Sequence, residues 1–324
     1  MNLASDPNPA GLKVLYIAGN GHSGSTLLDI MLGSTEGFFS GGELAFITRD
    51  SIFEEYCSCG QLIPECEIWS EIIGRWEENR HMHYGEYQQL RLKFERNKTS
   101  AVALKNRFFP SKDFKRYCEA TRNLFEAIRA VTGARVIIDS SKGPARIPVL
   151  HRISDVQVIH LCRDFKGVLN SAKKSSKKDI KAGIEADNPA RSTTKTLLDW
   201  LLNNLLCEVF CLGVKSKKVL YKDYVQRPEH LQKIRPELEG LLERAPYTAP
   251  HMLAGNVIRL KRDLHIDPQI GFQYKRLNSG LFRMASFIDR LFWFWSYPYS
   301  KPEDTRTTES SDAIGEANID GQRM

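Results

Sequence analysis

The sequence predicts an α/β fold in which a mostly parallel sheet is flanked by helices. Short apolar runs recur at residues 14–18, 136–138 and 158–161, and each is followed by glycine, hydroxyl or charged residues. Buried parallel strands have this continuous apolar character. Apolar residues at helical spacing fill much of the chain between the runs. Open parallel sheets bind ligands outside the carboxyl ends of their strands, so the residues that follow each run form the candidate site.

The first run leads into a glycine-rich loop. Gly19, Gly21 and Gly24 follow the strand, and Ser25-Thr26 begins a helix. Free backbone N–H groups in such a loop and the dipole of the helix favour an anion, although an ordinary glycine-rich turn is the alternative. The spacing approaches that of a P-loop, but Ser25 occupies the place of the P-loop lysine. We therefore expect binding of a phosphate-like group without γ-phosphoryl transfer.

Residues 23–26, Ser-Gly-Ser-Thr, resemble the loop that holds the 5′-phosphosulfate of PAPS (3′-phosphoadenosine 5′-phosphosulfate) in bacterial-type P-loop sulfotransferases. The residue before Ser-Gly is usually Lys or Arg in that family, whereas it is His22 here, and an imidazole is charged only when protonated. The resemblance implies that six residues of the loop bind the cofactor, namely Gly21, His22, Ser23, Gly24, Ser25 and Thr26.

Composition favours an anionic ligand. The formal net charge is +7, and no DNA- or RNA-binding motif accompanies it, so we expect no nucleic-acid partner. The N-terminal residues lack the basic and apolar regions of a secretory signal. No stretch reaches the roughly 18 uncharged apolar residues of a membrane span. The sequence therefore predicts a cytoplasmic protein without a transmembrane segment.

The chain has seven cysteines, an odd number that argues against a disulfide framework. Cys57, Cys59 and Cys66 lie close together in the sequence. A zinc site needs a fourth ligand, and only His81 or His83 lies nearby along the chain. We therefore favour structural thiols or a local disulfide over a metal, and we expect no metal cofactor.

Glu43 follows the first helix, after a glycine pair that predicts a turn beside a second strand or an edge loop. Its sequence neighbours are apolar or small, which makes it a candidate general base. A carboxylate at a helix start is the alternative. In the protein-tyrosine group of sulfotransferases, a Gly-Glu pair in this region supplies the base, and Gly42-Glu43 resembles that pair.

The strand at residues 136–138 ends in Asp139-Ser140-Ser141-Lys142. An apolar strand that ends in Asp also resembles a Walker B strand, so a nucleotide kinase stays an alternative. Lys142 is placed to replace the missing P-loop charge, although a solvated loop lysine is also compatible with the pattern. Sulfotransferases commonly carry catalytic side chains at this strand end, and the resemblance implies that Lys142 stabilises the leaving phosphate.

Arg163 ends the strand at residues 158–161, and Ser171 follows eight residues later on a predicted helix. A guanidinium and a hydroxyl in this arrangement can converge on one phosphate. The pair closely resembles the 3′-phosphate motif of sulfotransferases. The lysine-rich segment 173–195 is a solvated loop or a lid over an anionic cofactor.

Two late segments complete the pattern. Gly255, Asn256 and Arg259 resemble the basic loop that closes on the 3′-phosphate in sulfotransferases. Residues 281–295 are an apolar helix that packs against the domain or, through 281–299, contacts a second copy or another surface. We expect a flexible N-terminus at 1–11, a sulfotransferase domain at 12–300 and a disordered tail at 301–324.

The ordered motifs predict a PAPS-dependent sulfotransferase that moves a sulfuryl group to a hydroxyl or amine. Glu43 is the predicted base, with His22 as the other candidate, and Lys142 stabilises charge. The acceptor is a small molecule, a glycan or a lipid, which the sequence does not distinguish. A P-loop nucleotide or small-molecule kinase and a non-catalytic nucleotide-binding protein are the alternatives.

Overall fold

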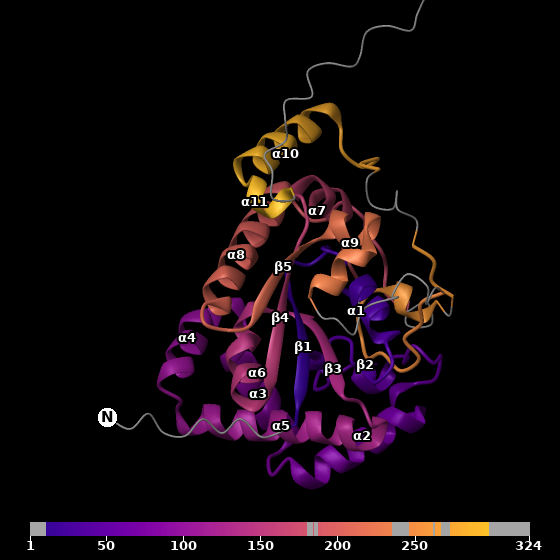
Figure 1. Cartoon of the computed structure of the whole chain (residues 1–324), viewed down its shortest axis with the longest axis vertical. Helices are drawn as coiled ribbons and strands as arrows, with labels where there is room; N and C mark the ends of the chain where they lie inside the picture. The colour runs from indigo at the N-terminus through magenta and orange to yellow at the C-terminus, as the bar shows by residue number, and fades with distance from the viewer. Residues whose placement is uncertain are drawn as a thin grey trace, which may run out of the picture.

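The computed structural model describes residues 11–179, 184, 187–234, 246–261, 263–266 and 273–297. Nearly all of the predicted flexible N-terminus and the whole predicted tail lie outside these residues. The described chain contains a parallel sheet with the strand order β2-β3-β1-β4-β5 (Figure 1). Its strands are β1 (Lys13–Gly19), β2 (Phe38–Ser40), β3 (Val136–Lys142), β4 (Asp155–Cys162) and β5 (Ser216–Leu220).

The central strand β1 lies between β3 and β4, and all pairings in the sheet are parallel. The chain fills one side of β1 with β2 and β3 and then crosses to the other side for β4 and β5. The register pairs Ala18 with Lys142 and Gly19 with Leu161. The residues that follow these three strands therefore meet at one edge of the sheet, at its topological switch point.

Side chains alternate along β1 between two apolar cores. Val14 and Tyr16 belong to the larger core, whereas Leu15 and Ile17 belong to the second, because successive residues of a strand point to opposite faces. The larger core packs under α2 (Glu67–Asn79), α3 (Tyr84–Phe94), α4 (Ser100–Phe108), α5 (Lys112–Thr132), α6 (Ile147–Ile153) and α8 (Thr193–Cys211). The second lies beneath α1 (Ser25–Gly33) and α9 (Tyr221–Gln226). The prediction of a parallel sheet flanked by helices is confirmed.

A third apolar cluster joins α7 (Phe165–Ala172) to α10 (Ser279–Leu291) and α11 (Trp293–Ser296). The helix expected at residues 281–295 is thus divided at Phe292. Asp289 is buried and accepts a hydrogen bond of 2.6 Å from the N–H of Phe165, which ties α10 to the start of α7. Burial and the nearby charge of Asp164 raise the pKa of Asp289 to about 6. Ala285 packs inward, so α10 is part of the domain.

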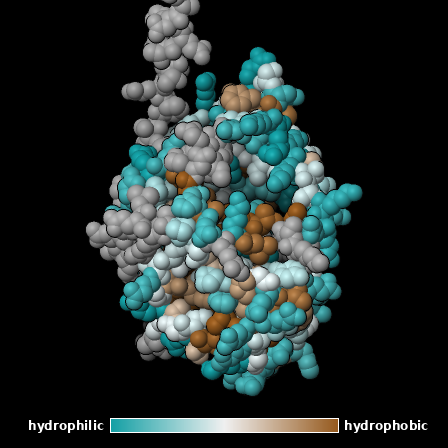
Figure 2. All heavy atoms as spheres, turned by 90° about the vertical axis from the view of Figure 1, so that its right-hand side faces the viewer, coloured by the Kyte–Doolittle hydropathy of each residue, from teal (hydrophilic) through white to brown (hydrophobic). Residues whose placement is uncertain are grey.

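The segment from Pro228 to Lys233, which follows α9, is a 3-10 helix. Within the described residues, no helix is both long and apolar enough to cross a bilayer. The side of the molecule that carries α1, α9 and β2 is mostly hydrophilic, with separate apolar patches (Figure 2).

Candidate anion-binding site at the carboxyl edge of the sheet

The glycine-rich loop connects β1 to α1 as an open cradle of backbone N–H groups. Within the described part of the chain, no acceptor contacts the N–H groups of residues 22–26. Gly24 precedes α1 with φ of 90°, and no side chain caps the helix. A loop of free donors at a helix N-terminus attracts an anion. The local structure thus has the form that the sequence predicts for a phosphate-type ligand.

Two tyrosines of α9 pack against Gly24 of this loop. The hydroxyl of Tyr224 donates a hydrogen bond of 2.9 Å to the carbonyl oxygen of Gly24. A Cβ atom at Gly24 would lie 2.4 Å from that hydroxyl and 2.5 Å from the ring of Tyr221. Only glycine satisfies both this packing and the positive φ. The sequence patterns that predicted the loop gave no sign of these partners, which lie about 200 positions away in the chain.

Arg163 and Ser171 both reach His22, from the end of β4 and from α7. The guanidinium Nη1 of Arg163 donates to the carbonyl oxygen of His22 at 2.8 Å. The hydroxyl of Ser171 lies 3.3 Å from Nδ1 of the same histidine. The guanidinium also stacks over Tyr221, 4.1 Å from the ring centroid. The structure therefore brings the predicted arginine and serine to the rim of the loop.

His22 has positive φ, 67°, and its side chain is exposed at the loop rim. The loop nevertheless removes part of the hydration of the imidazole, and this desolvation lowers its pKa to about 4. The positive charges of Arg191, Arg163 and Lys142 lower the pKa further in the same direction. At neutral pH the ring is uncharged, so it does not replace the charge of the Lys or Arg that is usual before Ser-Gly.

Lys142 and Glu43 form an ion pair beside the loop. The ammonium group of Lys142 donates to Oε1 of Glu43, and 23% and 14% of the two side chains are exposed. Glu43, whose neighbours in the sequence are apolar or small, therefore has a charged neighbour in the structure. Lys142 adopts φ of 69°, a left-handed conformation that non-glycine residues seldom take. Such strain often occurs at functional sites, where the surrounding structure enforces it.

A buried network supports the end of β3. Ser141 donates to the carboxylate of Asp139 and accepts a hydrogen bond of 2.9 Å from the N–H of Ala45. Asp139 is also paired with Arg146 at 2.7 Å, and Arg146 contacts Glu95 at 2.6 Å. Glu95 and Arg146 were not among the sequence-based candidates, because no motif links them. The network connects the core to the backbone next to Glu43.

The loop that carries Gly255, Asn256 and Arg259, the late loop, contacts the glycine-rich loop through Gly255 and Asn256. The N–H of Asn256 donates to the hydroxyl oxygen of Thr26 at 3.1 Å. A Cβ atom at Gly255 would lie 3.3 Å from the same oxygen. Arg259 is buried, and its guanidinium donates to the carbonyl oxygen of Gly255 at 2.9 Å and to that of Tyr56 at 3.4 Å. A phosphate contact of Arg259 stays a prediction.

The chain matches no protein-family model and no curated protein sequence. Among solved structures, it is similar to the sulfotransferase domain from the Synechococcus PCC 7002 olefin synthase, with 17% identity over 91% of this chain and 99% of that chain and a TM-score of 0.48. It is also similar to the sulfotransferase domain from the curacin biosynthetic pathway, with 15% identity over 91% of this chain and 95% of that chain and a TM-score of 0.44.

Proposed function

We propose that the chain is a PAPS-dependent sulfotransferase that acts on a hydroxyl or amine of an acceptor. The observation that carries the proposal is the meeting of Arg163 and Ser171 at His22, on the rim of a loop whose N–H groups have no acceptor among the described residues. Because the loop lacks the P-loop lysine that contacts the β- and γ-phosphates, it is suited to bind an anion but not to transfer a γ-phosphoryl group. When bound, PAPS supplies an activated sulfuryl group and leaves as adenosine 3′,5′-bisphosphate (PAP).

The loop residues are suited to hold the 5′-phosphosulfate end. The N–H groups of residues 22–26 donate to its oxygens without any rearrangement of existing backbone hydrogen bonds. The Thr26 hydroxyl accepts from Asn256, which leaves its own hydrogen available for donation. Ser25 adds a second hydroxyl beside it. Arg163 and Ser171 would contact the 3′-phosphate, with the guanidinium able to give bidentate contacts.

The ion pair of Lys142 and Glu43 provides both a cation that can stabilise negative charge and a base. Within the described residues, Glu43 is the only hydrogen-bond or ion-pair partner of the ammonium group. An anion bound in the loop would compete for Lys142, which would then stabilise the charge that develops on the leaving phosphate. Release of Glu43 from that contact makes its carboxylate available to accept the proton of the acceptor.

The kinase alternative is disfavoured by the surroundings of Asp139. A Walker B aspartate must reach Mg²⁺ at the phosphates. Asp139 is fully buried, and its Oδ1 accepts from the N–H of Ser141 at 3.0 Å while its Oδ2 accepts from Arg146 at 2.7 Å. Its carboxylate is therefore committed to the core, so the strand end offers Lys142 rather than a metal-binding acid.

The proposal predicts that PAP stabilises the chain more than AMP or ATP does and that Mg²⁺ is not required. At about 100 times its Kd, a ligand that binds only the folded state adds about 2.7 kcal/mol, which a thermal-shift measurement detects readily. Stabilisation by Mg·ATP alone would contradict the proposal and favour a kinase. Mass spectrometry would show whether any acceptor gains a sulfuryl group from PAPS. If the chain binds PAPS but no acceptor gains this group, the protein is a non-catalytic nucleotide-binding protein.

A second prediction concerns pH. The pKa of His22, about 4, is lowered partly by positive neighbours, so a bound anion raises it. Binding then takes up a proton, and the contribution of His22 to affinity grows as pH falls from neutrality. We expect the ratio of the PAP dissociation constants of His22→Gln and the unchanged protein to rise about three- to tenfold between about pH 7.5 and pH 5.5, measured by calorimetry.

The ionisation of PAP itself affects the dissociation constants of His22→Gln and the unchanged protein equally, so its effect cancels in their ratio. A ratio that stays constant over this pH range would show that the imidazole is not protonated in the complex. His230→Gln is a suitable control, because His230 lies in the 3-10 helix at Pro228–Lys233, outside the loop. Its ratio should not change with pH.

A further inference from the structure

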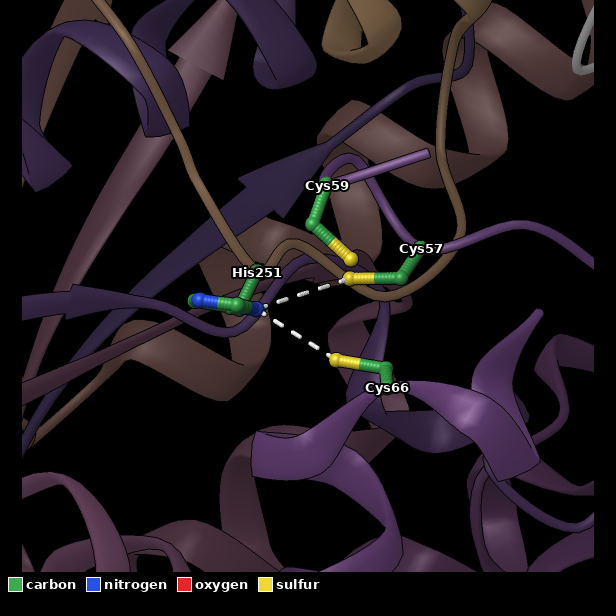
Figure 3. Close-up of side chains that lie close together, drawn as sticks. All are labelled: Cys57, Cys59, Cys66 and His251. Carbon is green, nitrogen blue, oxygen red and sulfur yellow. Dashed lines mark hydrogen bonds between the residues drawn. The ribbon is translucent and has the colours of Figure 1, made fainter. Parts of the chain in front are cut away.

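A second cluster of ligating side chains lies apart from the glycine-rich loop. Cys57, Cys59 and Cys66 come from the segment before α2, and His251 comes from the segment before the late loop. One ligand atom from each lies within 4.8 Å of all the others, and the side chains point toward a common centre (Figure 3). We propose that these four residues form a structural zinc site.

The distances suit a tetrahedral ion. Zinc–sulfur bonds of about 2.3 Å and zinc–nitrogen bonds of about 2.0 Å place tetrahedral ligand atoms about 3.5–3.8 Å apart. Nδ1 of His251 lies 3.3 Å from Sγ of Cys66 and 4.0 Å from Sγ of Cys57, which brackets the sulfur–nitrogen value. All the ligand atoms lie within 4.8 Å of one another, so shifts of up to about 1 Å would complete the geometry. Three thiolates and one imidazole form a closed set that is typical of structural zinc and too soft for Mg²⁺ or Ca²⁺.

Backbone hydrogen bonds shape the cysteine segment without help from an ion. The N–H of Cys57 donates to the carbonyl oxygen of Gln61 at 2.9 Å, and the N–H of Gly60 donates back to the carbonyl oxygen of Cys57 at 2.9 Å. Gly60 has φ of 90°, a conformation that closes this tight turn. The turn presents Cys57 and Cys59 together, and Cys66 follows directly before α2.

The histidine segment is fixed to the cysteine segment by further contacts. The indole N–H of Trp69 donates to the carbonyl oxygen of His251 at 2.7 Å. The hydroxyl of Ser58 accepts from the N–H of Met252 at 2.7 Å and donates to the carbonyl oxygen of Ala249. Both sides of His251 are therefore attached to the segment that carries the cysteines, so the ligands are preorganised.

Access and charge also suit the ion. Cys57 and Cys66 are fully buried, whereas a surface cavity of about 350 Å³ is lined by Cys59 and His251 and gives a path for entry. Zinc binding releases the three thiol protons to solvent, and the resulting complex of Zn²⁺ with three thiolates and a neutral imidazole has a net charge of −1. Arg259 and Lys261 line the same cavity and offset that charge.

The site would stabilise the cofactor-binding edge without taking part in the reaction. Leu253, two residues after His251, accepts a hydrogen bond of 2.9 Å from the N–H of Glu43, and Asn256 contacts Thr26. Zinc would thus fix the late loop against the first half of the chain. The inference rests on the four ligands alone, so it does not depend on the proposed sulfotransferase activity.

The test measures metal in the reduced, full-length protein expressed with added zinc. We expect about one equivalent of zinc per chain by mass spectrometry of the metal, and its loss in Cys66→Ser and His251→Gln. Cys211→Ser and His230→Gln are matched controls, because Cys211 ends α8 and His230 lies in the 3-10 helix at Pro228–Lys233, both outside the cluster. Both controls should keep the full equivalent.

A metal titration of the unchanged protein tests the proposal even if the variants fail to fold. After chelation under reducing conditions, titration with Co²⁺ should end at one equivalent, with the visible bands of a tetrahedral ion and ultraviolet charge-transfer bands from thiolates. Absence of these bands, a zinc content near zero, or a disulfide among Cys57, Cys59 and Cys66 in the freshly isolated protein would overturn the proposal. So would full zinc retention by both Cys66→Ser and His251→Gln.

Discussion

Glu43→Gln is expected to bind PAP as the unchanged protein does and to lose about two to four orders of magnitude in turnover, the usual size of a general-base contribution. The acceptor must lose a proton as the sulfuryl group arrives. Gln has nearly the same shape as Glu but cannot take that proton. The substitution also ends the ion pair with Lys142, which frees the ammonium group for the ligand. Affinity for PAP should therefore not fall.

The measurement is turnover of PAPS with an acceptor at saturation, together with calorimetric binding of PAP. Glu54→Gln is a matched control, because Glu54 is exposed in a short 3-10 helix outside the loop and should leave both values unchanged. Near-normal turnover of Glu43→Gln with loss of activity in His22→Ala would transfer the role of base to His22. A large loss of PAP affinity in Glu43→Gln would instead mean that Glu43 supports the cofactor site.

Much of the sheet is predictable from the sequence because its strands are buried on both faces. Each apolar run that the sequence identifies lies inside β1, β3 or β4, and the polar residues after each run lie at the carboxyl edge. The edge strands are less distinct. In β5, Ser216 and two lysines precede the apolar end of the strand, so its start cannot be read from hydropathy.

The parts of the site that the sequence does not reveal depend on contacts between distant residues. His251 completes the cysteine cluster although 185 positions separate it from Cys66. Tyr224 similarly meets Gly24 across 200 positions. Local spacing predicts ligands only within one segment, which is why the sequence points to His81 and His83 instead. The pairing of Lys142 with Glu43 depends on the sheet register and was missed for the same reason.

Substitution of Arg146 is expected to have the largest effect on stability. Its side chain is 1% exposed and pairs with Glu95 and Asp139, which are also buried. Arg146→Met leaves two carboxylates in the core without their cation. Removal of one partner from a buried ion pair typically costs about 3–5 kcal/mol. We expect a fall in Tm on the order of 5–15 °C by calorimetry.

Arg75→Met provides the contrast, because Arg75 pairs with Glu71 on the exposed face of α2, and its loss should cost about 0.5 kcal/mol or less. The sharper control adds Glu95→Gln and Asp139→Asn to Arg146→Met, since removal of all the charges should recover a large part of the lost stability. If the triple variant is no more stable than Arg146→Met, lost packing rather than uncompensated charge causes the effect.

Arg146→Met should also reduce turnover at temperatures where the protein stays folded. The carboxylate of Asp139 accepts a hydrogen bond from Ser141, and Ser141 accepts one from the N–H of Ala45, close to Glu43.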